Sequence, residues 1–115
     1  MHTTDIATLI ESLGIGRWYY GYNMLLEAIV RLCHADDELA CIKLNRDILA
    51  PLAEKYHCKG RCVDRNLRTV IQRAWQKNPA GLQQMTAYPL HAAPTVSEFL
   101  DILVAYVQRH GGLQE

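Results

Sequence analysis

The chain has 115 residues, half of them hydrophobic, and its twelve basic residues balance its twelve acidic residues to a formal net charge of zero. This length predicts one domain, residues 1–115, with enough apolar side chains for a core of its own. No apolar run approaches the ~18 residues that cross a bilayer, and the N-terminus lacks the basic start and long apolar block of a secretory signal. We therefore expect a cytoplasmic protein with no membrane partner.

The N-terminal part of the chain is predicted to be helical, because apolar residues recur at helical spacing. Thr4 or Asp5 can cap a first helix, which Gly14 ends. A second helix runs from about Arg17 or Tyr20 to Cys33. Acidic residues favour the start of a short third element over about 37–44, because they suit the positive end of a helix dipole.

A helix-turn-helix is predicted over about 47–77. Its first helix, DILAPLAEKY, has Pro51 in the first turn, where the missing N–H costs little. The connection HCKG has the length of a helix-turn-helix turn, and Gly60 permits the change of direction. The second, longer helix ends at Asn78-Pro79, since the residue before proline disfavours the helical region.

The remainder is predicted to hold a helical turn near 82–85 and one further helix. Thr95 and Glu98 form a capping box at the start of that helix, which frays at Gly111-Gly112. No segment shows sustained two-residue alternation, so a sheet is not expected. The predicted fold class is all-α, a compact bundle of about six helices that contains a helix-turn-helix.

Basic residues are concentrated between Lys55 and Lys77. This window holds seven of the twelve basic residues and one acidic residue, a local charge of +6 in a neutral chain. Apolar residues follow Val63 at helical offsets, so one face of the second helix is buried. Candidate base-reading residues share the opposite face, which Asp64 borders: Arg61, Arg65, Arg68 and Gln72. A solvated helix face is the alternative that spacing alone leaves open.

Four motifs in this order resemble the C-terminal DNA-binding effector domain of stage-zero sporulation protein A, the response regulator that starts endospore formation. The resemblance spans about 6–106. Its most specific parts are GYNMLLEAI (21–29), LAEKY (52–56), VDRNLRTVIQRAW (63–75) and PTVSEFL (94–100).

The resemblance implies an all-helical domain with a helix-turn-helix of the winged-helix-like, response-regulator effector type, whose fifth helix reads the major groove. It implies double-stranded promoter DNA as partner, with homodimers on tandem sites. The positions that match the family's DNA-facing acid and two arginines are Asp64, Arg65 and Arg68. Arginine can bond guanine O6 and N7, and a carboxylate can accept from cytosine N4. The remaining basic residues suit phosphates: Lys59, Arg61, Arg73 and Lys77.

Two features depart from the family pattern. Family members usually carry a receiver domain that controls dimerisation, and this chain starts almost directly at the effector domain. The turn reads HCKGRC (57–62), where the family tends to have small hydroxyl residues. Promoter choice is therefore expected to differ even with a shared docking mode.

The cysteines offer two further interpretations. Zinc ligand types are present, but no Cys-x-x-Cys knuckle pairs them, so neither a metal site nor a cofactor is predicted. Cys33 and Cys41 fit apolar positions and are expected to be buried thiols. Cys58 and Cys62 lie near lysine and arginine, which can lower a thiol pKa and allow redox sensing.

An enzyme is not predicted, because the histidines are scattered and no nucleophile, paired acids or phosphate cradle accompanies them. The aromatic cluster Trp18, Tyr19, Tyr20 and Tyr22 is interpreted as core packing, with an interaction patch as the alternative. Sequence-specific DNA binding is the predicted function. Its competitor is a protein-interaction module of the same fold that modulates a full-length regulator, which the neutral net charge favours.

Overall fold

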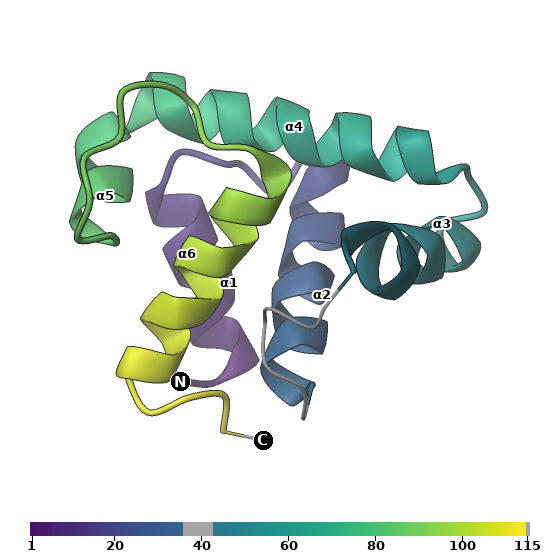
Figure 1. The fold of residues 1–115 in the computed structure, drawn as a ribbon, viewed down its shortest axis with the longest axis horizontal. Coiled ribbons are helices and arrows are strands. Elements are labelled where there is room, and N and C mark those ends of the chain that lie inside the picture. Colours follow the sequence, from purple (N-terminus) through teal and green to yellow (C-terminus); the bar gives the residue numbers. More distant parts are fainter. Residues whose placement is uncertain (36–42, 115) are drawn as a thin grey trace.

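The computed structural model describes residues 1–35 and 43–114. They form six α-helices and one π-helical segment, η2 (Figure 1): α1 (Thr3–Ser12), α2 (Tyr20–His34), η2 (Leu44–Leu49), α3 (Ala50–Lys55), α4 (Gly60–Lys77), α5 (Pro79–Gln84) and α6 (Val96–Arg109). These described residues contain no strand, which confirms the all-α prediction and means that no β-hairpin wing lies within them. The element expected over about 37–44 lies largely outside the described residues.

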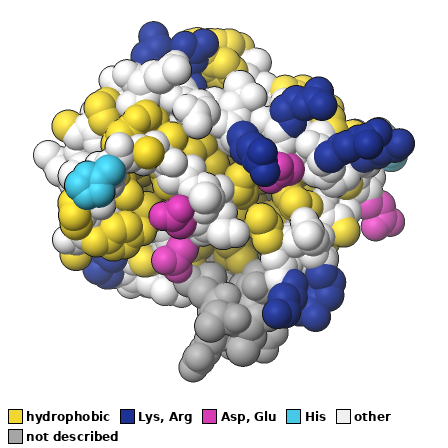
Figure 2. All heavy atoms as spheres, turned by 45° about the horizontal axis from the view of Figure 1, so that its top comes forward, with side chains coloured by type: hydrophobic (Ala, Val, Ile, Leu, Met, Phe, Trp, Pro, Cys, Tyr) yellow, Lys and Arg dark blue, Asp and Glu magenta, His cyan; other side chains and the backbone are white. Residues whose placement is uncertain are grey.

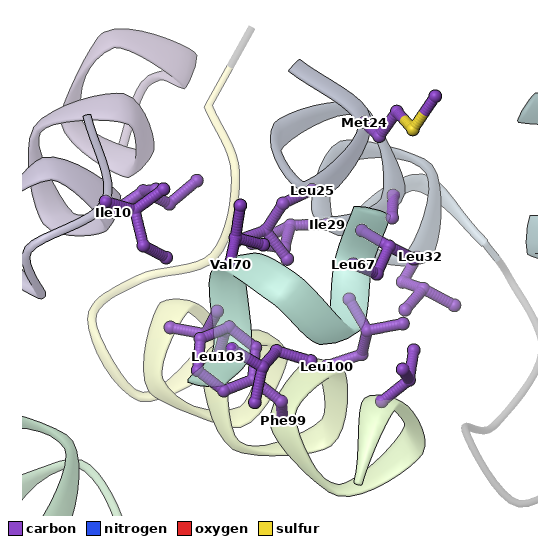
Figure 3. Close-up of a cluster of buried hydrophobic side chains, with 14 of the residues drawn as sticks. Ile10, Met24, Leu25, Ile29, Leu32, Leu67, Val70, Phe99, Leu100 and Leu103 are labelled. Carbon is purple, nitrogen blue, oxygen red and sulfur yellow. The ribbon is translucent and has the colours of Figure 1, made fainter. Parts of the chain in front are cut away.

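The helix α4 lies across the ends of α2 and α6, which run beneath it (Figure 1). Its predicted apolar stripe is buried throughout: Val63, Leu67, Val70, Ile71 and Ala74. Figure 3 shows Leu67 and Val70 between Leu25 and Ile29 of α2 and Leu103 of α6. Burying a large aliphatic side chain contributes ~1.5–3 kcal/mol, so this contact fixes how α4 is rotated about its axis.

The first helix starts earlier than expected. The N-cap is His2 rather than Thr4 or Asp5, because the carboxylate of Asp5 accepts a hydrogen bond from the backbone N–H of His2 at 2.8 Å. Asp5 therefore closes the first turn from inside the helix. The end of α1 is as predicted, with Gly14 in the left-handed region at φ 94°.

The helix-turn-helix begins at Leu44, three residues before the predicted start, because η2 continues into α3. The left-handed residue of the connection is His57, with φ 55°, and not Gly60, which is the first residue of α4. The N–H of Cys58 donates to the carbonyl of Ala53 at 2.9 Å, and that of His57 to Glu54 at 3.3 Å. This is a Schellman motif, so the chain reverses immediately after α3 and the glycine is left free to start the next helix.

Capping side chains set the C-terminal part of the fold. The predicted capping box is confirmed: the N–H of Glu98 donates to Thr95 Oγ1 at 3.2 Å, and the N–H of Thr95 donates to Glu98 Oε1 at 3.3 Å. The predicted turn near 82–85 is the helix α5, which starts at Pro79 and receives a cap from the Asn78 side chain. Among the described residues, no helix combines the length and apolar character needed to cross a bilayer.

The closest approach between α2 and α4 depends on a glycine. A Cβ added at Gly21 would lie 2.4 Å from the backbone oxygen of Asn66 and 3.0 Å from a methyl group of Val70. A backbone oxygen cannot swing away as a flexible side chain does. The helix α2 therefore packs on α4 at this distance only without a side chain at residue 21.

Gly21→Ala is expected to destabilise the protein although alanine is the better helix former by about 1 kcal/mol. The added methyl group forces α2 away from α4 and loosens the buried contacts of both helices. Gly60→Ala is the matched control, because its Cβ would meet only Leu49 Cβ at 3.8 Å, an ordinary contact. Urea unfolding of both variants measures the difference. An equal or higher stability of Gly21→Ala than of Gly60→Ala would contradict this packing.

Candidate nucleic-acid interface

The face of α4 opposite the core carries the predicted base-reading side chains. Arg61, Arg65, Arg68 and Gln72 are all exposed. At 1.5 Å per residue they extend over about 16 Å of the helix, roughly five base-pair steps of B-DNA. Figure 2 turns this side of the molecule toward the reader and shows Lys and Arg side chains spread across it. The structure thus brings these four residues together on one outward surface.

Asp64 is placed differently from the other four candidates. Its Oδ2 pairs with Nε of Arg68 at 2.9 Å, one helical turn away, and the Asp64 side chain is only 22% exposed against 73% for Arg68. The two residues together line two shallow grooves, one toward the start of α6 and one toward η2 and α3. The carboxylate therefore holds Arg68 between these grooves and keeps its second oxygen available as an acceptor.

The predicted phosphate-binding residues occupy both ends of α4 and one side. Lys59 is the exposed N-cap residue and Lys77 the exposed last residue, roughly 27 Å apart at the rise of an α-helix. Arg73 is half-buried, with its guanidinium 5.5 Å from the ring centroid of Tyr19. This stacking holds Arg73 on the side of α4 next to the chain that enters α2.

The environment of Cys58 disfavours its thiolate form. Partial burial, together with a hydrogen bond to Cys62, raises the pKa of the Cys58 thiol, so the expected lowering by nearby cations is wrong. Burial likewise raises the pKa of Cys33, which is half-buried, and Cys41 lies outside the described residues. Within the described part of the chain, no three His, Cys, Asp or Glu side chains gather as a metal site would require.

Two aromatic side chains that were interpreted from the sequence as core packing lie at the surface. Trp18 is 83% exposed and Tyr20 60% exposed, whereas Tyr22 is buried as expected. The core interpretation is wrong for Trp18 because residues 15–19 form a connection, turned by a hydrogen bond from the Tyr19 N–H to the Gly16 carbonyl. It is also wrong for Tyr20, the first residue of α2, whose ring meets the edge of Tyr56 at the surface. The glycines at 14 and 16 are the sequence signal for that turn.

Comparison with protein families gives a match to residues 6–107, nearly the whole chain. The matching family model is described as sporulation initiation factor Spo0A C terminal. The matched residues include every helix that contributes to the exposed face of α4 and to the core beneath it.

Cys58 is expected to react slowly with iodoacetamide at pH 7, because a raised pKa leaves less thiolate, the reacting form, at that pH. Its rate should increase as the pH rises through the raised pKa. The same residue in the urea-unfolded chain is the reference, followed by mass spectrometry of its peptide. Faster labelling in the folded protein than in the unfolded chain would restore the redox-sensing interpretation.

Proposed function

The chain belongs to the family of Spo0A C-terminal domains, and on that premise we propose that α4 enters the major groove of promoter DNA and reads base edges there. The family consists of DNA-binding effector domains of sporulation initiation and is not a family of enzymes. The function of this family is therefore DNA binding in transcription regulation. The finer assignment below concerns which residues make the contacts.

The observation that carries the proposal is the orientation of α4. Its apolar stripe is buried against α2 and α6, and the opposite face presents three arginines to solvent. Within the described chain, Arg61 and Arg65 make no ion pair, so their guanidinium donors are not engaged by the protein itself. An α-helix of about 10–12 Å diameter fits the ~12 Å major groove.

We assign base reading to the centre of this face. Arg65 and Arg68 have the fork geometry that bonds guanine O6 and N7, and Gln72 can bond adenine N6 and N7. Asp64 uses Oδ2 to hold Arg68, which leaves Oδ1 to accept from cytosine N4. Arg61, closer to the N-terminus of α4, is assigned to a base edge or the adjoining phosphate.

Phosphate contacts are assigned to Lys59, Arg73 and Lys77. Each lies at an end or on a side of α4, where the DNA backbones pass. Such contacts fix register without carrying sequence information.

Residues 1–115 act as one DNA-binding domain in the cytoplasm in this mode of binding. Following the family resemblance, two copies bind tandem promoter sites as a homodimer. No metal or cofactor takes part in this mode of binding.

A protein-interaction module that has lost DNA binding is the competing function. The formal net charge of zero favours it, since non-specific attraction to DNA is weaker for a neutral protein. The engagement of Arg68 by Asp64 also favours it. This competitor predicts no salt-dependent binding to any duplex.

Arg65→Ala is expected to weaken binding to the family's promoter element by about 1–3 kcal/mol and to relax base preference at one position. Electrophoretic shifts with the element and with each single base-pair substitution measure both effects. Arg31→Ala is the matched control, because it removes an exposed arginine at the far end of α2. Unchanged affinity and preference in Arg65→Ala would show that this face does not read DNA.

Lys77→Ala is expected to weaken binding to all duplexes about equally and to flatten the dependence of log affinity on log salt by about 0.9, the value for one phosphate contact. Titrations at several salt concentrations give the slope. The assignment of Lys77 fails if its slope equals that of the unmodified protein, or if the loss depends on sequence.

A further inference from the structure

We propose that an aromatic shelf beside α4 binds the phosphate backbone of the DNA strand that borders the major groove. The aromatic shelf comprises Trp18, Tyr19 and Tyr20, together with Arg73 of α4. The inference rests on the proposed function, because the shelf meets a backbone only when α4 lies in the groove. It adds a contact surface from outside the helix-turn-helix.

Three close contacts attach the shelf to one side of α4. Gly21, next to Tyr20, lies against the backbone of Asn66, and Arg73 lies over the Tyr19 ring at 5.5 Å. Gly14 precedes the aromatic residues in the sequence, and a Cβ added to it would lie 2.5 Å from Lys77 Cβ. The shelf is therefore fixed along α4 between Asn66 and Lys77, from both of its ends.

The two outermost rings of the shelf are exposed and have unused hydrogen-bond donors. Trp18 is 83% exposed and tilts over Tyr19 at 5.8 Å, while Tyr20 is 60% exposed and meets the edge of Tyr56 at 6.2 Å. In the described chain, neither the Trp18 indole N–H nor the Tyr20 hydroxyl donates to another residue. Each ring thus contacts an aromatic neighbour and remains largely exposed.

The position of the shelf matches that of a DNA backbone. A helix of about 10–12 Å diameter fills a ~12 Å major groove, so the two sugar-phosphate backbones pass along its sides. Arg73 follows Arg65 by eight residues, which places it about 80° around the helix axis from the base-reading direction. The side of α4 that carries the shelf is therefore the side along which one backbone runs.

The charges of the two sides of α4 favour a phosphate ligand at the shelf. Asp64 lies about 100° around the axis from Arg65 in the opposite sense, so α4's carboxylate is on the other side. The shelf itself contributes a guanidinium, and the carboxylate of Glu11 near it is paired with Arg17 at 2.9 Å. Tyrosine hydroxyls and other neutral donors commonly hold phosphate oxygens beside a reading helix.

The test compares Trp18→Ala/Tyr20→Ala with the unmodified protein on a duplex that carries a single promoter element. Loss of two neutral hydrogen bonds is expected to weaken binding about fivefold or more, with the salt slope unchanged because neutral donors release no counterions. Arg73→Ala is expected to flatten that slope by about 0.9. Ethylation interference should lose its signal at phosphates of one strand in the double variant and keep it on the other.

Two further variants control for folding and position. Tyr20→Phe removes only the hydroxyl and keeps the ring on Tyr56, so reduced affinity in this variant supports the shelf even if the double variant folds poorly. His110→Ala removes an exposed ring at the C-terminal end of α6, far from α4 (Figure 1), and is expected to bind as the unmodified protein does. Circular dichroism confirms the folding of each variant.

The outcomes separate this inference from the proposed function. If Arg65→Ala loses base preference while the double variant and Tyr20→Phe keep full affinity and the same ethylation pattern, the shelf does not contact DNA and the inference is wrong. If the unmodified protein binds no duplex, the proposed function fails and the shelf fails with it.

Discussion

The burial of one side of α4 is the constraint on which the rest of the structure depends. Five apolar residues of this helix are buried against α2, α6 and the other elements that contact α4, so the direction of every other α4 side chain is set. A rotation of α4 by one residue, about 100°, would bury Asp64 or Arg68 in an apolar core, where an unpaired charge is strongly unfavourable. The glycine at residue 21 makes this arrangement possible by letting the α2 backbone reach α4.

The exposed face of α4 carries a weak side-chain pair of its own. The Asp64–Arg68 pair is an i,i+4 contact between an exposed arginine and a partly buried carboxylate, and such pairs on helix surfaces contribute about 0.3–0.5 kcal/mol. Such a pair restricts where the guanidinium points without preventing it from exchanging one partner for another. In the proposed complex, a bidentate bond from Arg68 to guanine, worth about 1–3 kcal/mol, would exceed that cost. The neutral net charge of the chain is therefore compatible with a face that gains its energy from local contacts.

Local patterns in the sequence were enough to predict the all-α fold, the extent of α4 and its buried stripe, because helical periodicity reports directly which side is covered. The capping box at Thr95 was predictable because Glu98 follows Thr95 at the three-residue spacing of that motif. The reversal of the chain at His57 could not be predicted. A Schellman motif usually has glycine in the left-handed position, and the glycine of this connection is Gly60, three residues after His57. The Asp64–Arg68 pair was visible as an i,i+4 spacing, but whether Arg68 bends toward Asp64 depends on the grooves around it. The exposure of Trp18 could not be predicted, because it depends on how the connection 15–19 crosses the side of α4.

Dimethyl sulfate probing of guanine N7 tests the central claim most directly, because N7 lies in the major groove and is contacted by the base-reading arginines in this account. Bound protein is expected to protect guanines within one short segment of the promoter element, and Arg65→Ala is expected to restore methylation at one of them. Tight binding with every guanine N7 still reactive would contradict this expectation, since α4 would then lie outside the major groove.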